Sequence, residues 1–243
     1  MSYGPECPLD VERPVMLHRW ERLSFLHWSF EPSVVQRLLP PWLRVEPYED
    51  RAWVGLVPFF MRVSTRRGRS VRYVSNFCET NVRTYVRDQE GRSGIWFFSL
   101  DAARLGAVLT ARATYRLPYF WSKMDLIERD GEIRYTCDRR WPKPRARSVV
   151  ELRIGPAFGA DELTERDHFL TARWVLFSST GTRHRFANAQ HSPWPLRRAT
   201  AVEWKDELLR AAGLPVIQDG PICHYSEGVD VRIGRPQRYA AAR

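Results

Sequence analysis

The stretch that decides the fold of this chain is Arg112-Ala-Thr-Tyr-Arg-Leu-Pro-Tyr-Phe-Trp-Ser-Lys-Met124. It joins strand-forming aromatic residues to Lys123, one of only three lysines in 243 residues. Side chains alternate in an extended chain, so a strand over residues 117–126 directs Tyr119, Trp121 and Lys123 to one face. Either face of such a strand can line a cavity.

Short predicted strands surround this stretch on both sides. Residues 100–111 are rich in alanine and leucine and predict a helix with Asp101 as its N-cap. The other predicted strands lie at residues 20–30, 43–48, 52–63, 73–87, 95–100, 132–138, 148–154, 174–178 and 198–204, with short helices at 31–39, 164–172 and 205–212 and a last hairpin at 222–233. This pattern predicts one β-rich α+β domain at residues 15–235, after an irregular arm at 1–14 and before a tail at 236–243.

Composition narrows the class of protein but names no partner. The net charge is +10, and 44% of the residues are hydrophobic, which suits a chain with a sizeable core. No apolar run is long enough to span a membrane, and the first residues lack the order of a signal peptide. The four cysteines are scattered and form no C-x-x-C pair, so we expect reduced thiols and a cytoplasmic protein.

Two motifs carry a resemblance to a known family. Arg112 and Pro118 keep the spacing that precedes the Schiff-base lysine in the acetoacetate decarboxylase superfamily, and Asn76-Phe-Cys-Glu-Thr80 is similar to the segment with its site glutamate. The whole chain resembles the YqjF-like branch, a domain-of-unknown-function family. The resemblance implies a curled sheet or cone-like barrel around a central cavity, and it favours a homo-oligomer. It also implies that Tyr119 stands where the decarboxylases have their lysine.

An imine mechanism would therefore need another lysine, and Lys123 is the candidate in the same strand. An imine-forming lysine has to be neutral near pH 7. Lys123 lies four residues past the family position, so the rise of the strand displaces its backbone by ~13 Å. The alternative interpretation is that Lys123 extends from the strand end into solvent.

Glu79 is the stronger candidate for chemistry, because it matches the family glutamate. In a largely apolar cavity its carboxyl would have a raised pKa and could act as a general acid or base. Asn81 and Arg83 follow at intervals of two and share its strand face. The alternative is a structural ion pair of Glu79 with Arg83 or Arg112.

His191 is the third candidate, because it precedes a rigid proline-rich turn, His191-Ser-Pro-Trp-Pro-Leu196. Such a histidine could be a fixed acid, a base or a lid group, or it could be structural. Trp194 beside it could cap the core. Cys223, His224 and His191 have no recognised zinc spacing, so we predict no metal and no cofactor.

Nucleic-acid binding is the alternative from another functional class. Residues 66–69 and 139–147 form basic loops, and the second contains Trp141, which could stack on a base. Acidic residues are spread through the chain, and no RRM, KH or helix-turn-helix signature is present. Solvated basic loops are therefore the simpler interpretation.

The leading hypothesis is a cavity for a small organic acid or ketone-like ligand, in a non-Schiff-base lyase or related enzyme that uses Glu79 as acid or base. The alternatives are Schiff-base chemistry through Lys123 and nucleic-acid binding through the two loops. The predicted partner is a small molecule, with no nucleic acid and no membrane. The candidate catalytic residues are Glu79, Tyr119, Lys123 and His191, and the candidate ligand-binding residues are Arg83, Arg112, Trp121 and Trp194.

Overall fold

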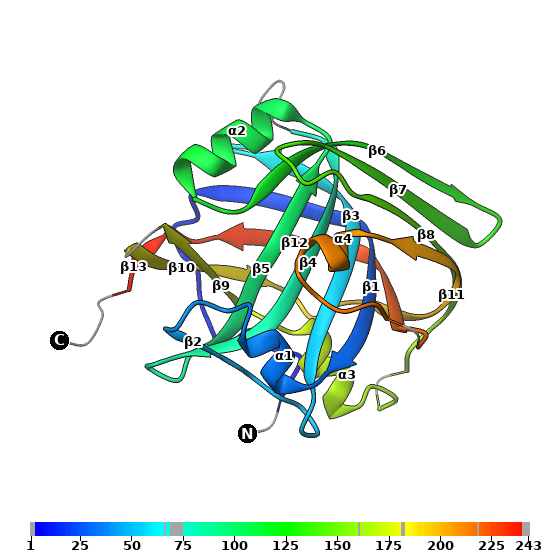
Figure 1. Cartoon of the computed structure of the whole chain (residues 1–243), viewed down its shortest axis with the longest axis horizontal. Coiled ribbons are helices and arrows are strands. Elements are labelled where there is room, and N and C mark those ends of the chain that lie inside the picture. The colour runs from blue at the N-terminus through cyan, green and yellow to red at the C-terminus, as the bar shows by residue number, and fades with distance from the viewer. Residues whose placement is uncertain are drawn as a thin grey trace.

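The computed structural model describes residues 3–65, 67–68, 75–159, 161–180, 183–217 and 219–239. Within them, thirteen strands form one strongly curled sheet with four short helices at its ends (Figure 1). The strands are β1 (Met16–Phe30), β2 (Leu43–Val45), β3 (Ala52–Ser64), β4 (Phe77–Asp88), β5 (Ser93–Ala102), β6 (Tyr119–Arg129), β7 (Glu132–Trp141), β8 (Arg147–Ala157), β9 (Val175–Thr180), β10 (Arg183–His191), β11 (Leu196–Asp206), β12 (Ile222–Ile233) and β13 (Gln237–Arg238). The helices are α1 (Pro32–Gln36), α2 (Leu105–Thr114), α3 (Glu165–Thr171) and α4 (Leu208–Ala211).

Nine of the strands close into a barrel, as predicted for a cone-like fold. Around the ring the order is β1, β3, β4, β5, β6, β7, β8, β11 and β12, and β12 pairs back onto β1. Neighbours are antiparallel except β5 and β6, which run parallel and are joined through α2. A closed ring leaves no free edge among these strands.

Two strands of the barrel fork and create a second ring. The first half of β5 pairs with β9 and its last residues pair with β6, while β12 pairs with β11 early and with β10 late. Strands β9 and β10 therefore close a second ring across the shared strands β12, β1, β3, β4 and β5. The shared strands β3 and β4 are mostly buried on both faces. In β3 this gives a nearly continuous apolar run, whereas β4 carries polar side chains on its cavity face.

The two faces of the shared strands pack into separate cores. The core inside the barrel contains Leu26, Leu56 and Val82 together with side chains of β7 and β8. The core inside the second ring contains Phe25 and Phe59 and is covered at one end by α2 (Figure 1). The ladder between β1 and β3 shifts register between Glu21 and Leu26, and this irregularity divides β1 between the two cores.

Asp101 has a different place from the one predicted. It is the penultimate residue of β5, and α2 starts four residues later after Arg104. Asp101 is completely buried inside the barrel, where it binds the guanidinium of Arg139 at 2.6 and 2.8 Å and accepts a hydrogen bond from Ser122 at 2.7 Å. The N-cap prediction was wrong because the carboxylate has a charged partner across the sheet, on β7.

Several other predicted elements differ from the structure. The predicted hairpin at residues 222–233 is a single strand, β12. Strand β10 was not predicted, and β13 lies in the predicted tail and pairs with it. Confirmed elements include the helix that starts at Pro32 and the helix after Thr164, where Thr164 and Asp167 form a capping box. In the described part of the chain no helix has both the length and the apolarity to cross a membrane.

Candidate functional site

The second ring encloses a cavity of about 150 Å³. Side chains of β1, β3, β4 and β5 form one side of it, β9 and β10 form the other, and α2 contributes Ala107 and Ala111. Most of the lining is apolar. The polar side chains among the described lining residues are His18, Glu79, Asn81, Arg83, Thr110, Tyr115, Tyr119, Thr171, Arg173, Ser178 and His191.

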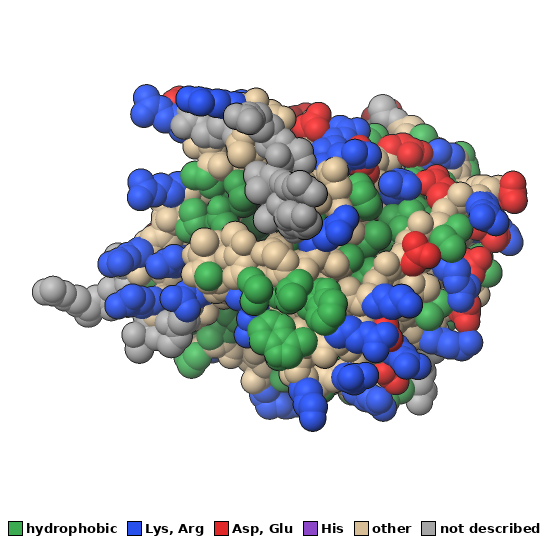
Figure 2. Space-filling view, turned by 90° about the horizontal axis from the view of Figure 1, so that it is seen from above, with side chains coloured by type: hydrophobic (Ala, Val, Ile, Leu, Met, Phe, Trp, Pro, Cys, Tyr) green, Lys and Arg blue, Asp and Glu red, His purple; other side chains and the backbone are tan. Residues whose placement is uncertain are grey.

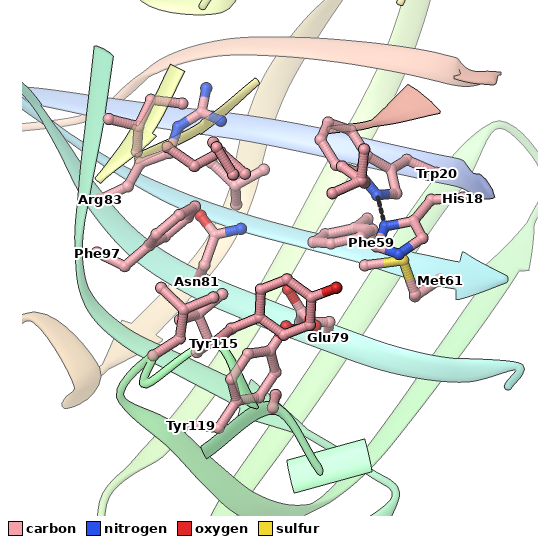
Figure 3. A pocket seen from close by; sticks show the side chains of 18 of the residues that line it. His18, Trp20, Phe59, Met61, Glu79, Asn81, Arg83, Phe97, Tyr115 and Tyr119 are labelled. Carbon is pink, nitrogen blue, oxygen red and sulfur yellow. Dashed lines mark hydrogen bonds between the residues drawn. The ribbon is translucent and has the colours of Figure 1, made fainter. Parts of the chain in front are cut away.

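One face of β4 supplies the central polar wall. Glu79, Asn81 and Arg83 all line the cavity, as their spacing of two predicted. They are buried, with exposed fractions of 2%, 6% and 6%. Figure 3 shows Asn81 between Glu79 and Arg83, so the wall has an acidic end and a basic end.

Glu79 is held in its neutral form at the acidic end. The hydroxyl of Tyr119 donates a hydrogen bond to Oε2 of Glu79 over 2.9 Å. Burial raises the pKa of Glu79 to about 8, the negative charge of Asp101 adds to the rise, and the hydrogen bond from Tyr119 opposes it. In the described part of the chain Glu79 has no ion pair, so the proposed pairs with Arg83 and Arg112 do not form.

Arg112 supports Tyr119 from outside the cavity wall. Its Nη1 donates to the carbonyl oxygen of Tyr119 at 2.7 Å, and its guanidinium lies 5.5 Å from the ring centre of Trp141. The side chain therefore fixes the start of β6 and does not itself line the cavity. It is a positioning residue for the phenol.

His191 and Trp194 both line the cavity. The His191 ring packs against Trp174 and Trp194, with centroid distances of 4.4 and 4.8 Å. Its Nδ1 donates to the carbonyl oxygen of Ser192, and burial lowers the pKa of His191 to about 4. The imidazole is therefore neutral at pH 7 and is held in one tautomer.

Lys123 and Trp121 do not belong to the cavity. Trp121 is 37% exposed, and Lys123 lies on the outer surface beyond the last β6 residue that pairs with β5. None of the three lysines lines the cavity. Lys123 therefore extends into solvent, as one of its two interpretations predicted. The Schiff-base alternative has no lysine amine in this cavity.

Three notable side chains that line the cavity were not predicted from the sequence: those of His18, Trp20 and Arg173. His18 and Trp20 lie near each other on β1, where the indole Nε1 of Trp20 donates to Nδ1 of His18 at 3.4 Å (Figure 3). Burial lowers the pKa of His18 to about 4, and its Nε2 has no hydrogen-bond partner in the described part of the chain. Arg173, just before β9, reaches the cavity near Arg83. His18 and Trp20 are two residues apart and therefore share one face of β1, which the sequence could have shown. The predicted strand began at residue 20 and left His18 out.

The histidine and cysteine residues considered for a metal site do not form one, and His224 already contacts an acidic side chain. Nε2 of His224 lies 3.0 Å from Oδ1 of Asp167. Within the described residues, no group of three histidine, cysteine or acidic side chains is arranged to hold a metal ion.

The second basic loop begins later in the chain than predicted. Arg139 is buried against Asp101, and Arg140 pairs with Asp138 at 2.8 Å, so the loop after β7 begins only at residue 142. Arg66 and Arg69 of the other loop lie outside the described residues. On the face seen in Figure 2, basic side chains are dispersed among acidic and apolar ones.

The family of the chain follows from comparison with known proteins. Residues 18–230 match DUF2071, described as an uncharacterized conserved protein. The chain belongs to this family. It is 31% identical over 220 residues to the uncharacterized protein YqjF of Bacillus subtilis (strain 168), a match that covers 89% of each chain. The predicted YqjF-like resemblance is thereby confirmed.

Solved structures confirm the fold of this DUF2071 member. Acetoacetate decarboxylase from Legionella pneumophila superposes with a TM-score of 0.66 at 12% identity, covering 96% of this chain and 92% of that one. The enduracididine biosynthesis enzyme MppR, complexed with pyruvate, gives 0.62 at 13% identity, covering 98% of both chains. The predicted acetoacetate-decarboxylase-like barrel is therefore correct. At these identities the likeness concerns the fold alone.

Proposed function

We propose that the cavity binds a small organic acid or ketone-like molecule and that Glu79 exchanges a proton with it. The observation that carries this proposal is the buried Glu79 carboxyl, whose pKa of about 8 lies close to neutral pH and whose Oε2 is fixed by Tyr119. A group whose pKa lies near the working pH is suited to act as either acid or base.

The chemistry follows from the two states of Glu79. With its proton, Glu79 donates a hydrogen bond to a carbonyl oxygen of the ligand. Without it, Glu79 removes a proton from the carbon next to that carbonyl, and Tyr119 stabilises the carboxylate. Proton transfer at such a carbon is a step that needs no imine, which fits a cavity without lysine. Because MppR has been crystallised with pyruvate, 2-oxo acids belong in the set of ligands to test.

The decisive experiment measures binding and proton exchange together. Ketones, 2-oxo acids and 3-oxo acids are titrated into the protein by calorimetry, and exchange of their carbon-bound protons in deuterium oxide is followed by proton NMR. We expect Glu79→Gln to abolish catalysed exchange while the protein stays folded. Glu227→Gln, on an exposed part of β12, is the matched control. A large loss of thermal stability in Glu79→Gln with unchanged binding and exchange would refute the role of Glu79.

A further inference from the structure

Two buried guanidinium groups lie at the end of the cavity opposite Glu79. Arg83 comes from β4, and Arg173 comes from the segment between α3 and β9. Their exposed fractions are only 6% and 5%. Both pack against aromatic rings, including that of Tyr85, whose centre lies 5.9 Å from the Arg83 guanidinium and 4.9 Å from that of Arg173.

The carboxylates of the protein do not neutralise this end. Glu46 is the acidic partner of Arg173, at 3.8 Å, but it also pairs with Arg87 and accepts a hydrogen bond from Tyr3. Arg83 forms no ion pair within the described residues. Its Nη2 donates to the carbonyl oxygen of Leu170 at 3.2 Å, which supplies only a partial negative charge.

Several polar atoms at or near this end are buried and have no hydrogen-bond partner among the described residues. They are Nε of Arg83, Nε of Arg173 and Oδ1 of Asn81, while Nη2 of Arg173 has only the 3.8 Å ion-pair contact. A buried charge without a counter-ion is costly, and so is a buried donor without an acceptor. Neighbouring His191 cannot act as a counter-ion, because an imidazole is neutral or positively charged; burial and the Arg83 charge both lower its pKa. An anion in the cavity would supply both a counter-ion for the guanidinium groups and acceptors for their unpaired N–H groups.

We propose that Arg83 and Arg173 bind the carboxylate of the ligand, and that the ligand is an oxo acid whose carbonyl is separated from this carboxylate by about five methylene groups. This inference rests on the proposed function, because it takes Glu79 as the partner of the carbonyl. It adds the orientation of the ligand and its length.

The length follows from the strand. Four residues separate Glu79 from Arg83, so their backbones are ~13 Å apart along β4. We take this backbone separation as the distance between the carboxyl and the guanidinium. Hydrogen bonds of about 3 Å at either end then leave a gap that a three-carbon acid cannot bridge. On either side of Asn81 the cavity wall is apolar, since Val57 and Leu100 are its partners across the two ladders. An alkyl chain is complementary to that middle section.

The test compares three ligands by calorimetry on the full chain: 7-oxooctanoate, its primary amide and pyruvate. We expect 7-oxooctanoate to bind about tenfold or more tightly than either of the others, because charge-assisted hydrogen bonds exceed neutral ones. Arg83→Gln removes the preference for acid over amide. Arg153→Gln, an exposed arginine paired with Glu132, leaves it unchanged. Glu79→Gln also keeps the preference, because Glu79 lies at the other end.

Each other outcome has a definite meaning. Equal affinity for acid and amide in the unmodified protein, or tighter binding of pyruvate, would overturn this inference even if Arg83→Gln failed to fold. If ketones still undergo Glu79-dependent exchange in that case, the proposed function survives alone. If no ketone or oxo acid binds at millimolar concentration, both proposals fail.

Discussion

The phenol of Tyr119 reaches across β5 to hold the carboxyl of Glu79 at 2.9 Å, although β4 and β6 are not paired with each other. The hydrogen bond joins residues forty positions apart in the sequence. Because β5 separates the two strands, the contact forms only when the parallel β5–β6 pairing has placed Tyr119 opposite Leu100. The hydrogen bond between Tyr119 and Glu79 is therefore assembled by the same pairing that closes the barrel.

Stability of the unliganded protein should fall as pH rises from about 4.5 to about 8. The folded pKa of Glu79 is about 8 against an ordinary value of 4.5, so in this window the folded state holds a proton that the unfolded state has released. The slope from this one group is at most about 1.4 kcal/mol per pH unit. Urea unfolding at several pH values measures it. In Glu79→Gln this contribution to the slope disappears, whereas Glu227→Gln keeps it; an unchanged slope in Glu79→Gln would contradict the raised pKa.

Arg83→Met should stabilise the protein when no ligand is present. The substitution replaces a buried charge that has no carboxylate partner with an apolar chain of similar length, and the expected gain in the free energy of unfolding is about 1–3 kcal/mol. Arg87→Met is the contrasting variant, because Arg87 pairs with buried Glu46 and its loss should destabilise. Urea titration at pH 7 compares them. Destabilisation by Arg83→Met would show that Arg83 already has sufficient partners.

Asp101→Asn should cost about 3–5 kcal/mol of unfolding free energy, since it leaves the guanidinium of Arg139 buried without its counter-ion. The side chains are only 0% and 1% exposed. Glu132→Gln breaks the exposed pair with Arg153 and should cost less than about 1 kcal/mol. Thermal and urea unfolding of both variants give the comparison, and equal costs would argue against a strong buried pair.

Borohydride reduction in the presence of β-keto acids should leave Lys123 unmodified. The amine lies on the outer surface beside a second pocket, and it does not line the cavity that contains Glu79. Intact mass and peptide mapping detect any reduced adduct, and Lys123→Met should bind ligands as the unmodified protein does. A stoichiometric adduct on Lys123 would restore the Schiff-base alternative.

Gly228→Ala should destabilise the protein by about 3 kcal/mol or more, because two independent constraints meet there. The residue has a φ of +129°, and a Cβ would lie 2.0 Å from the carbonyl oxygen of Trp20. Gly4→Ala is the matched control, since its Cβ would meet nothing within 4 Å. Circular dichroism melting curves measure both. A similar melting temperature for the two variants would mean that β1 and β12 separate easily.

Local patterns in the sequence were sufficient to predict features that depend on residues close together in the chain. The shared face of Glu79, Asn81 and Arg83 follows from the period of two in a strand, and the helix after Thr164 follows from its capping residues. The family motif identified Tyr119 as the residue at the lysine position. These signals lie within a few residues of the site that they describe.

Long-range pairing decided what the sequence pattern missed. Asp101 was interpreted as a helix cap because the alanine-rich run follows it, but its partner Arg139 becomes a neighbour only when β6 and β7 join the barrel. Arg173 reaches the cavity only because β9 pairs with β5 across the fork. Lys123 lies four residues after Tyr119, so simple alternation places both on one face of β6. The strand, however, runs past the end of the cavity before residue 123. Alternation specifies a face and cannot specify what covers that face.

The fork in the sheet also divides the cavity wall into strands that serve both cores and strands that do not. Strands β1, β3 and β4 serve both cores, so a substitution there disturbs the barrel as well as the cavity. Strands β9 and β10 carry cavity residues such as Leu176, Ser178 and Ala187, while Val175, Phe177 and Phe186 pack in the small cluster around Trp42. This wall can be redesigned, by evolution or in the laboratory, without altering the barrel that supports the rest of the site.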